Sequence, residues 1–339
     1  MTNDNWGMSP PVFSEIEAAA LCIAPVAIVT PLLDSPVVNE RVGGRVLVKA
    51  EGLQRTGSFK IRGAYNRMAQ LSDNERSNGV VAYSSGNHGQ AVAAAARLLG
   101  TTAVIVMPAD APQAKIVKTK AFGAEVVLYD RYREDRVAIG EKVAIERGLV
   151  LVPPYEDRRI IAGAGTLGRE IAMQADAMGA RLDALLVCCS GGGLTAGCAL
   201  ALEALSPETA VIAVEPVGFD DTGRSLAAGE RVSNESGARS ICDALLVETP
   251  GLLSFAINRR LVSGAVAVTD DEAVEAMATA FREFGVVVEP SGAIALAAIL
   301  SGRYDARDKT VVATITGSNV DIDTATELMT SRLRLRATM

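Results

Sequence analysis

Histidine is almost absent from this 339-residue chain, which contains only His88. A Ser-His-Asp hydrolase would have to use that one residue, and a zinc site built from several histidines is excluded. Acid–base chemistry must therefore fall to lysine, serine, tyrosine, carboxyl groups or a bound cofactor. His88 itself lies in a turn rich in Ser, Gly and Asn, where packing of the loop is its expected role.

Cysteine pairs, long apolar segments and basic clusters are also lacking. The five cysteines form no C-x-x-C motif and are odd in number, which favours free thiols in a reducing cytoplasm. The apolar residues 18–30 are too few to span a bilayer, include Pro25 and follow acidic residues, unlike a signal peptide. The net charge of −7, with charges interspersed, excludes general affinity for nucleic acid. We therefore expect a cytoplasmic protein that acts on a small molecule, with no membrane or nucleic-acid partner.

Lys60 lies within residues 57–64, Gly-Ser-Phe-Lys-Ile-Arg-Gly-Ala, between a turn of small residues and the start of a predicted helix. Phe59 and Ile61 favour burial, which disfavours the ammonium form and lowers the pKa of a lysine. A partly neutral amine can form a Schiff base with an aldehyde. The alternative is a surface lysine whose stem covers apolar neighbours while its amine reaches water.

A second motif, Ser-Ser-Gly-Asn-His-Gly-Gln-Ala at residues 84–91, follows the strand-like residues 79–83 and precedes a predicted helix. Free backbone N–H groups at such a helix start suit a carboxylate. Without a ligand, the same turn would be an ordinary strand-to-helix connection with Asn87 as the cap.

A third motif, Ser-Gly-Gly-Gly-Leu-Thr-Ala-Gly at residues 190–197, lies between the apolar residues 184–189 and another predicted helix. This arrangement is typical of a phosphate cradle, because small residues let the backbone approach an anion at the positive end of the helix dipole. The motif also fits the dinucleotide fingerprint G-x-G-x-x-A, and Glu215 ends the next strand about 20 residues on. An NAD-dependent oxidoreductase therefore stays open, although it leaves the first two motifs unexplained.

The fourth motif, at residues 311–321, is a β-rich run that ends in a polar turn containing Thr316. In this order, the four motifs resemble the fold-type II pyridoxal-phosphate enzymes, in the branch with threonine dehydratase and serine racemase. The resemblance covers about residues 14–325. Most of those enzymes have Ser at the position of Thr316, so the chain departs in detail but keeps a neutral hydroxyl. With a neutral hydroxyl facing its pyridine nitrogen, the cofactor ring accepts electrons less strongly than it would beside Asp. This suits β-elimination, in which the leaving group takes the electrons.

Predicted strands and helices alternate along the chain, which is typical of parallel sheets covered by helices. The predicted strands cover residues 80–84, 103–107, 126–129, 149–152, 184–188, 211–215 and 311–316, and the predicted helices include residues 113–122 and 136–147. The resemblance implies an α/β fold with two parallel-sheet domains, similar to the β subunit of tryptophan synthase, and the cofactor between them. Residues 1–78 and 156–339 would form the large domain, and residues 79–155 the small inserted domain.

The resemblance also implies roles for individual residues. Lys60 would hold pyridoxal 5′-phosphate as a Schiff base and, once freed, remove the α-proton of the substrate. Ser85 lies where the racemases place a second base on the opposite face, and Asn87 would face the phenolic oxygen of the cofactor. The implied cofactor contacts are Phe59, Lys60, Asn87, Ser190, Gly191, Gly192, Gly193, Leu194 and Thr316. The implied substrate contacts are Ser84, Ser85, Gly86, Asn87, His88 and Arg136.

Three carboxylates fall within the seven residues from Glu215 to Asp221. Hard cations prefer carboxylate and carbonyl oxygens. The resemblance to the racemase branch implies a Mg²⁺ or Ca²⁺ ion held by Glu215, Asp221 and the backbone oxygen of Phe219. The alternative is an acidic turn that is simply solvated.

These features predict a homodimeric pyridoxal-phosphate-dependent ammonia-lyase that converts a β-hydroxy amino acid, of the L-threonine or L-serine type, to a 2-oxo acid and ammonia. Arg136 falls where racemase-like enzymes have an arginine near the mouth of the active site. An arginine there could hold a second carboxylate and favour 3-hydroxyaspartate. Pairing of Arg136 with neighbouring acids is the alternative. Activity like that of serine racemase, and a non-catalytic amino-acid-binding protein, also stay open.

Overall fold

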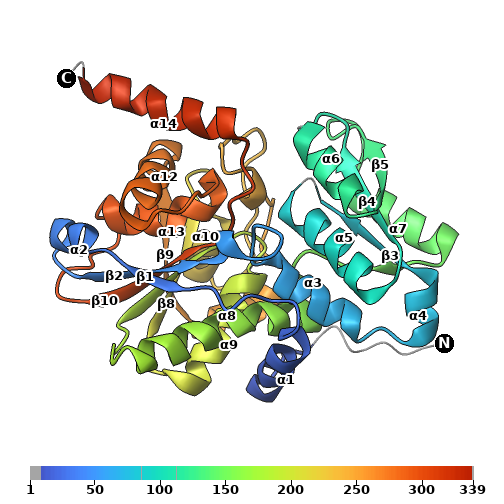
Figure 1. Ribbon diagram of the computed structural model, residues 1–339, viewed down its shortest axis with the longest axis horizontal. Coiled ribbons are helices and arrows are strands. Elements are labelled where there is room, and N and C mark those ends of the chain that lie inside the picture. Colours follow the sequence, from blue (N-terminus) through green and yellow to red (C-terminus); the bar gives the residue numbers. More distant parts are fainter. Residues whose placement is uncertain (1–8, 85, 112, 338–339) are drawn as a thin grey trace.

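The computed structural model describes residues 9–84, 86–111 and 113–337, which form two lobes built on separate sheets (Figure 1). The larger sheet has the strand order β1-β2-β10-β7-β8-β9, and its neighbouring strands are parallel except for the antiparallel pair β1–β2. Its strands are β1 (Leu32–Asp34), β2 (Arg45–Ala50), β7 (Ala184–Cys188), β8 (Ala210–Pro216), β9 (Val262–Val268) and β10 (Thr310–Ile315).

The smaller sheet has the order β5-β4-β3-β6, and all its pairs are parallel. Its strands are β3 (Val80–Tyr83), β4 (Ala103–Pro108), β5 (Glu125–Tyr129) and β6 (Val150–Leu151). All four lie within the range 79–155 that the sequence assigns to an inserted domain. The division of the chain at those two positions stays a prediction.

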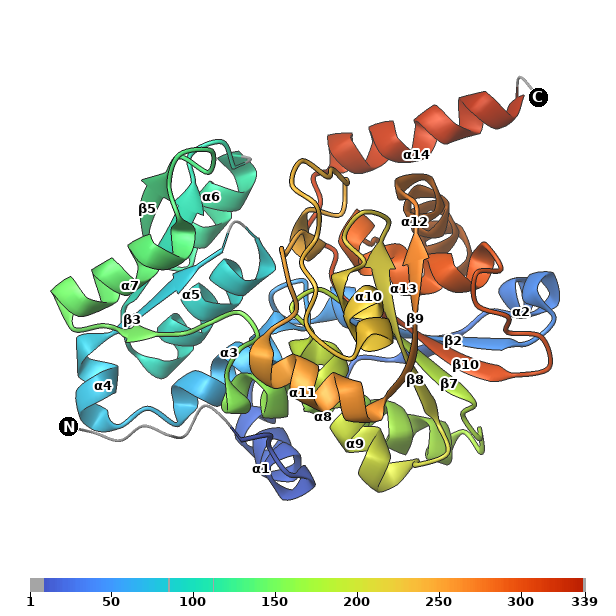
Figure 2. The same cartoon turned by 180° about the vertical axis from the view of Figure 1, so that it is seen from behind.

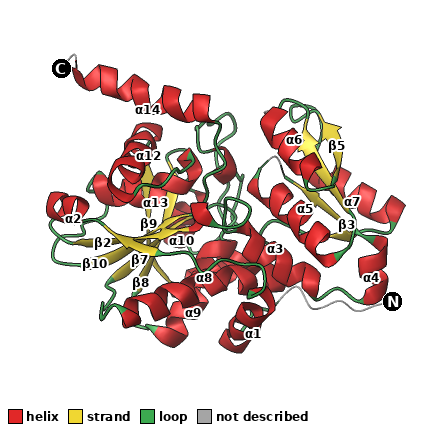
Figure 3. Cartoon of the chain, in the orientation of Figure 1, coloured by secondary structure: helices red, strands yellow, loops and turns green. Residues whose placement is uncertain are grey.

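Helices cover both faces of the larger sheet, as the two opposite views show (Figures 1 and 2). Buried residues of α8 and α9 pack on one face, and buried residues of α12 and α13 pack on the other. The connections between strands are mostly helical (Figure 3). The helices are α1 (Phe13–Ile23), α2 (Pro36–Val42), α3 (Lys60–Ala69), α4 (Asp73–Asn78), α5 (Asn87–Leu99), α6 (Gln113–Ala121), α7 (Arg136–Arg147), α8 (Arg158–Ala177), α9 (Gly193–Leu205), α10 (Asp221–Ala228), α11 (Leu252–Leu261), α12 (Asp270–Phe284), α13 (Pro290–Leu300) and α14 (Ile322–Ala337), with short 3₁₀ helices η2 (Glu51–Leu53) and η3 (Asp243–Leu245).

The central strand β7 shows why the sequence reveals these elements. Leu186 faces the core beside α12 and α13, whereas Leu185 and Val187 face the core beside α8 and α9. A parallel strand that is buried on both faces reads as a continuous apolar run rather than an alternating one. The predicted limits of this strand and of helix α7 agree with the structure residue for residue.

The strands β1, β2 and β9 are missing from the predicted set. Strand β9 lies at the edge of the sheet, is only half-buried and contains Ser263 and Gly264, so its strand character is weak. Within the described ranges, no helix combines the length and the apolar character needed to cross a membrane.

The sheets place three of the four motifs at equivalent points. The second motif begins directly after β3, the third motif begins two residues after the end of β7, and Thr316 directly follows β10. Ligands of open parallel sheets bind beyond the carboxyl ends of the strands. The fold therefore directs all three loops towards one region between the lobes.

Candidate active site

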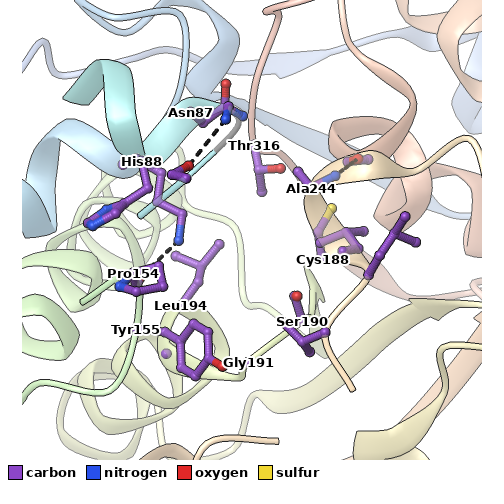
Figure 4. Close-up of a pocket in the computed structure, with 18 of the residues that line it drawn as sticks. Asn87, His88, Pro154, Tyr155, Cys188, Ser190, Gly191, Leu194, Ala244 and Thr316 are labelled. Atoms are coloured by element: carbon purple, nitrogen blue, oxygen red, sulfur yellow. Dashed lines mark hydrogen bonds between the residues drawn. The ribbon is translucent and has the colours of Figure 1, made fainter. Parts of the chain in front are cut away.

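A cavity between the two sheets brings together the motifs that the sequence singles out (Figure 4). Every predicted cofactor or substrate residue in the described part of the chain lines it. These are Phe59, Lys60, Ser84, Gly86, Asn87, His88, Arg136, Ser190, Gly191, Gly192, Gly193, Leu194 and Thr316. Ser85, the predicted second base, lies outside the described residues. The roles assigned to these residues stay predictions, but their convergence on one cavity is observed.

Lys60 is the first residue of α3, and its Nζ donates a hydrogen bond of 2.8 Å to the Pro154 carbonyl oxygen. The Nζ atom also lies 5.2 Å from the centre of the Phe59 ring. Burial lowers the pKa of Lys60 to about 8. A substantial fraction of this amine is therefore neutral in mildly alkaline solution, and the neutral form is the one that attacks an aldehyde.

Asn87 opens helix α5, and both ends of its side-chain amide have partners. Its Oδ1 accepts a hydrogen bond of 2.7 Å from Asn319, and its Nδ2 donates one of 2.5 Å to Glu289 Oε1. An amide nitrogen carries two hydrogens, so one remains for a ligand oxygen in the cavity. Burial raises the pKa of Glu289 to about 7, and nearby Asp243 adds to this rise.

His88 lies behind this loop and is buried. Its Nε2 is 2.9 Å from the Val152 carbonyl oxygen, which can only accept, so Nε2 carries the proton. Burial, helped by the charge of Lys60, lowers the pKa of His88 to about 3. The ring therefore stays neutral at physiological pH, as expected of a residue that packs the loop.

The glycine loop leads from β7 into α9. Gly192 has φ +88°, a backbone conformation that residues with a side chain rarely adopt. Side chains at Gly191 or Gly193 would collide with Tyr155, since a Cβ at these positions would lie 2.5 Å and 2.9 Å from Tyr155 atoms. The hydroxyl of Thr195, in the first turn of α9, is buried and has no hydrogen-bond partner within the described residues. An uncovered helix N-terminus with a free hydroxyl is suited to bind an anion.

Thr316 follows β10 and lines the cavity on the side of Cys188 (Figure 4). Its backbone carbonyl accepts a hydrogen bond of 3.1 Å from the Phe59 N–H group. Because Phe59 precedes Lys60, this contact joins the end of β10 to the start of the lysine helix. The hydroxyl predicted to face a pyridine nitrogen is therefore close in the fold to the residue predicted to hold the aldehyde.

Arg136 opens α7 and lines the cavity, with its side chain largely exposed. The neighbouring acids are used elsewhere: Glu134 accepts from the Asp130 N–H, and Asp135 caps α7 by accepting from the Val137 N–H. Within the described ranges Arg136 forms none of the ion pairs found in the structure. Burial raises the pKa of Tyr83 and of Tyr155, which share the cavity wall, and the positive charge of Arg136 opposes this rise.

The predicted metal ligands Glu215 and Asp221 lie together outside the lining of the cavity, Glu215 near the end of β8 and Asp221 as the first residue of α10. Both oxygens of Glu215 accept hydrogen bonds, from the Thr222 N–H (2.9 Å) and the Gly223 N–H (2.8 Å). Burial and the charge of Asp221 raise the pKa of Glu215 to about 8. Glu215 is thus enclosed by α10, and the structure contradicts the alternative in which it would read a nucleotide ribose.

Several residues of the cavity were not anticipated from the sequence. Apart from Thr195, which belongs to the third motif, they lie outside the four motifs, so only their position in the fold reveals them. The main ones are Tyr83, Lys115, Pro154, Tyr155, Cys188, Thr195, Asp243, Glu289 and Ser291.

Known proteins with similar sequences and structures include ammonia-lyases, a serine racemase and a threonine deaminase. The chain is 41% identical over 300 residues to an L-threo-3-hydroxyaspartate ammonia-lyase of Pseudomonas sp, covering 88% of this chain and 92% of that relative. It is 36% identical over 313 residues to a serine racemase of Schizosaccharomyces pombe, covering 92% and 95%. The solved structure of a T.th. threonine deaminase superposes with a TM-score of 0.86 at 40% identity, covering 92% of this chain and 99% of that one.

These similarities confirm the predicted fold-type II architecture, and they argue against the oxidoreductase and against a non-catalytic binding protein. The family model for pyridoxal-phosphate dependent enzymes matches residues 23–317, nearly the whole chain. The protein belongs to the pyridoxal-phosphate dependent enzyme family.

Proposed function

We propose that this protein is a pyridoxal-phosphate-dependent ammonia-lyase that converts β-hydroxy amino acids to 2-oxo acids and ammonia. The observation that carries the proposal is the amine of Lys60, which burial leaves partly neutral in a cavity that also contains an anion cradle. The names of its relatives, which include an ammonia-lyase and a threonine deaminase, support the same reaction class.

The residues present fit the cofactor. Lys60 would hold its aldehyde, and the glycine loop with the unpartnered Thr195 hydroxyl would hold its phosphate. Asn87 has one amide hydrogen left for the phenolic oxygen, and Thr316 offers a neutral hydroxyl to the ring nitrogen. When bound, pyridoxal phosphate supplies an electron sink that makes the α-proton of the amino acid acidic.

The protein itself contributes binding and proton transfer. Backbone N–H groups at the start of α5 would bind the α-carboxylate, and Lys60 Nζ would take the α-proton. The β-hydroxyl then leaves as water, and one water enters when the released enamine hydrolyses. The net change is therefore one amino acid to one 2-oxo acid and one ammonia.

Within this reaction class, the structure favours a substrate with a second carboxylate. Arg136 lines the cavity without an acidic partner in the described part of the chain, and a guanidinium binds a carboxylate through two parallel hydrogen bonds. We therefore place 3-hydroxyaspartate ahead of L-threonine and L-serine as the substrate. Serine racemization is the second candidate, because a relative of 36% identity carries that name.

A divalent cation at Glu215 and Asp221 is part of the proposal. Two buried carboxyl groups lie next to each other, and Asp221 Oδ2 has no hydrogen-bond partner within the described residues. Burial raises the pKa of Asp221 to about 6. Unpaired buried carboxylates are costly, and a cation would stabilise them. In the described ranges no three or more acidic, histidine or cysteine side chains cluster as metal ligands, so the Phe219 carbonyl and water would complete the shell.

The direct test is release of 2-oxo acid from threo-3-hydroxyaspartate, L-threonine and L-serine by the cofactor-loaded protein. We expect a yellow protein that releases 2-oxo acid and ammonia in equal amounts, fastest from hydroxyaspartate. Lys60→Ala should abolish release while circular dichroism stays unchanged. Chiral analysis of serine in the same reactions detects racemization. A yellow protein that interconverts serine enantiomers without releasing ammonia would replace the lyase with the racemase. The predicted homodimer and cytoplasmic location stay predictions.

A further inference from the structure

The connection from β6 to α8, residues 152–157, contacts three parts of the site: Lys60, His88 and the glycine loop. Its Val152 and Pro154 carbonyl oxygens accept from His88 and Lys60, as described above. The ring of Tyr155 lies against the glycine loop (Figure 4). The next residue, Glu156, does not line the cavity, and its carboxyl group lies at the N-terminus of α11 instead.

Glu156 caps a helix that it does not belong to. Its Oε1 accepts a hydrogen bond from the Leu253 N–H, in the first turn of α11. Residue Gly251, at the cap position of α11, offers no side chain of its own. A Cβ there would lie 1.9 Å from Glu156 Oε2, so the missing side chain makes room for the carboxyl group. Glu156 thus takes the place of the missing N-cap.

The same end of α11 holds the glycine loop. The Gly191 carbonyl accepts from the Ser254 hydroxyl and from the Gly251 N–H, the latter at 3.1 Å. The Gly192 carbonyl accepts from the Ala196 N–H of its own helix α9 at 2.9 Å and from Asn258 Nδ2 of α11 at 3.3 Å. Both side chains, of Ser254 and Asn258, are fully buried. The Gly191 carbonyl therefore points towards the start of α11, whereas α9 and α11 share the Gly192 carbonyl.

Because peptides are planar, the hydrogen bonds of these carbonyl groups also set the direction of the loop N–H groups at the cavity. In a planar trans peptide the C=O and N–H groups point in opposite directions. The Gly191 carbonyl shares its peptide with the Gly192 N–H, and the Gly192 carbonyl shares its peptide with the Gly193 N–H. With the Gly191 carbonyl held by α11, the Gly192 N–H points away from α11, towards the anion cradle. The Gly193 N–H is oriented by the start of α9 together with Asn258, because both donate to the Gly192 carbonyl.

We propose that Glu156 is a positioning residue for the cofactor phosphate, acting through α11 and its hydrogen bonds to the Gly191 and Gly192 carbonyl groups. This inference rests on the proposed pyridoxal-phosphate site. The carboxyl group is half-buried, and its Oε2 has no hydrogen-bond partner in the described part of the chain. Burial raises the pKa of Glu156, and the Leu253 N–H and the charge of Arg231 oppose this rise.

The test measures binding of pyridoxal phosphate to cofactor-stripped protein, by its visible absorbance. Glu156→Ala should weaken binding about tenfold, the effect of losing about 1.4 kcal/mol of loop preorganisation. Glu156→Gln should recover most of the affinity, because an amide oxygen can still accept from Leu253. Ser254→Ala should weaken binding similarly, and the double variant should be no weaker than either single variant by more than about threefold. The absorbance maximum should not move, since Lys60 is unchanged.

A cap far from the site provides the matched control. The Thr269 hydroxyl accepts from the Glu272 N–H at 3.2 Å and caps α12. Thr269→Ala should lower the melting temperature without changing cofactor affinity. If Glu156→Ala lowers the melting temperature but binds the cofactor within twofold of wild type, or if Thr269→Ala weakens binding equally, Glu156 is only a structural cap. If wild type itself binds no pyridoxal phosphate, the proposed function fails instead.

Discussion

Replacing Arg136 tests the substrate preference, because this side chain has no role in the chemistry itself. A hydrogen bond to a charged group contributes about 1.5–3 kcal/mol, and because Arg136 is exposed we assign about 1.5–2 kcal/mol to its two bonds together. Arg136→Ala should therefore lower kcat/KM for threo-3-hydroxyaspartate by about 10–30-fold, since 1.4 kcal/mol corresponds to tenfold. The values for L-threonine and L-serine, which have no second carboxylate, should change less than about threefold. The assay is initial-rate release of 2-oxo acid from each substrate.

Two further variants sharpen this test. Arg136→Lys keeps the charge but loses the forked geometry, so its kcat/KM for hydroxyaspartate should fall between wild type and Arg136→Ala. Arg97 is an exposed arginine in the last turn of α5, outside the cavity, and Arg97→Ala should leave all three substrates unaffected. Equal losses for hydroxyaspartate and threonine in Arg136→Ala would refute recognition of a second carboxylate, and would indicate that Arg136 shapes the cavity instead.

Three other predictions concern the cofactor, the cation and pH. Gly191→Ala should abolish the yellow colour, because the new Cβ would lie 2.5 Å from the Tyr155 ring; a yellow variant of normal affinity would contradict the tight fit. EDTA should lower the melting temperature of wild type but not of Glu215→Gln, which lacks one of the proposed ligands. The control is Asp220→Asn, whose carboxylate is partly exposed, and EDTA should lower its melting temperature as in wild type. A wild-type melting temperature that EDTA leaves unchanged would mean that no cation binds. Burial lowers the pKa of Lys60 from 10.5 to about 8, so protonation favours the unfolded state. The free energy of unfolding of cofactor-free protein should therefore rise between pH 8 and 10 more in wild type than in Lys60→Met, and identical slopes would show that Lys60 is not buried.

The local sequence was sufficient to identify several elements whose environment is uniform, although it missed the buried strand β2, whose apolar run is interrupted by Lys49. Strand β7 is apolar throughout because helices cover both faces of the sheet, and α7 begins at an Asp cap and ends at Gly148 with φ +66°. The loops after β3 and β7 were identifiable for a related reason. A backbone that must approach an anion requires small residues, and small residues between a strand and a helix are visible in the chain itself.

The partly exposed parts of the fold could not be identified in this way. Ser263 and Gly264 interrupt the apolar residues of edge strand β9, and only Val268 of the strand is buried, so it gives no strong periodic signal. Helix α14 was likewise not anticipated, since its described residues combine apolar and charged side chains in no clear pattern. Local propensity is a weak guide where burial does not reinforce it.

The chain by itself thus determined the chemistry: a lysine, an anion loop and a neutral hydroxyl in the order of one enzyme family. Only the tertiary structure decided how those groups act. The lowered pKa of Lys60 depends on burial by segments distant in sequence, and the orientation of the glycine loop depends on α11 and Glu156. These effects arise from contacts between residues more than 60 positions apart, and no local pattern encodes such contacts.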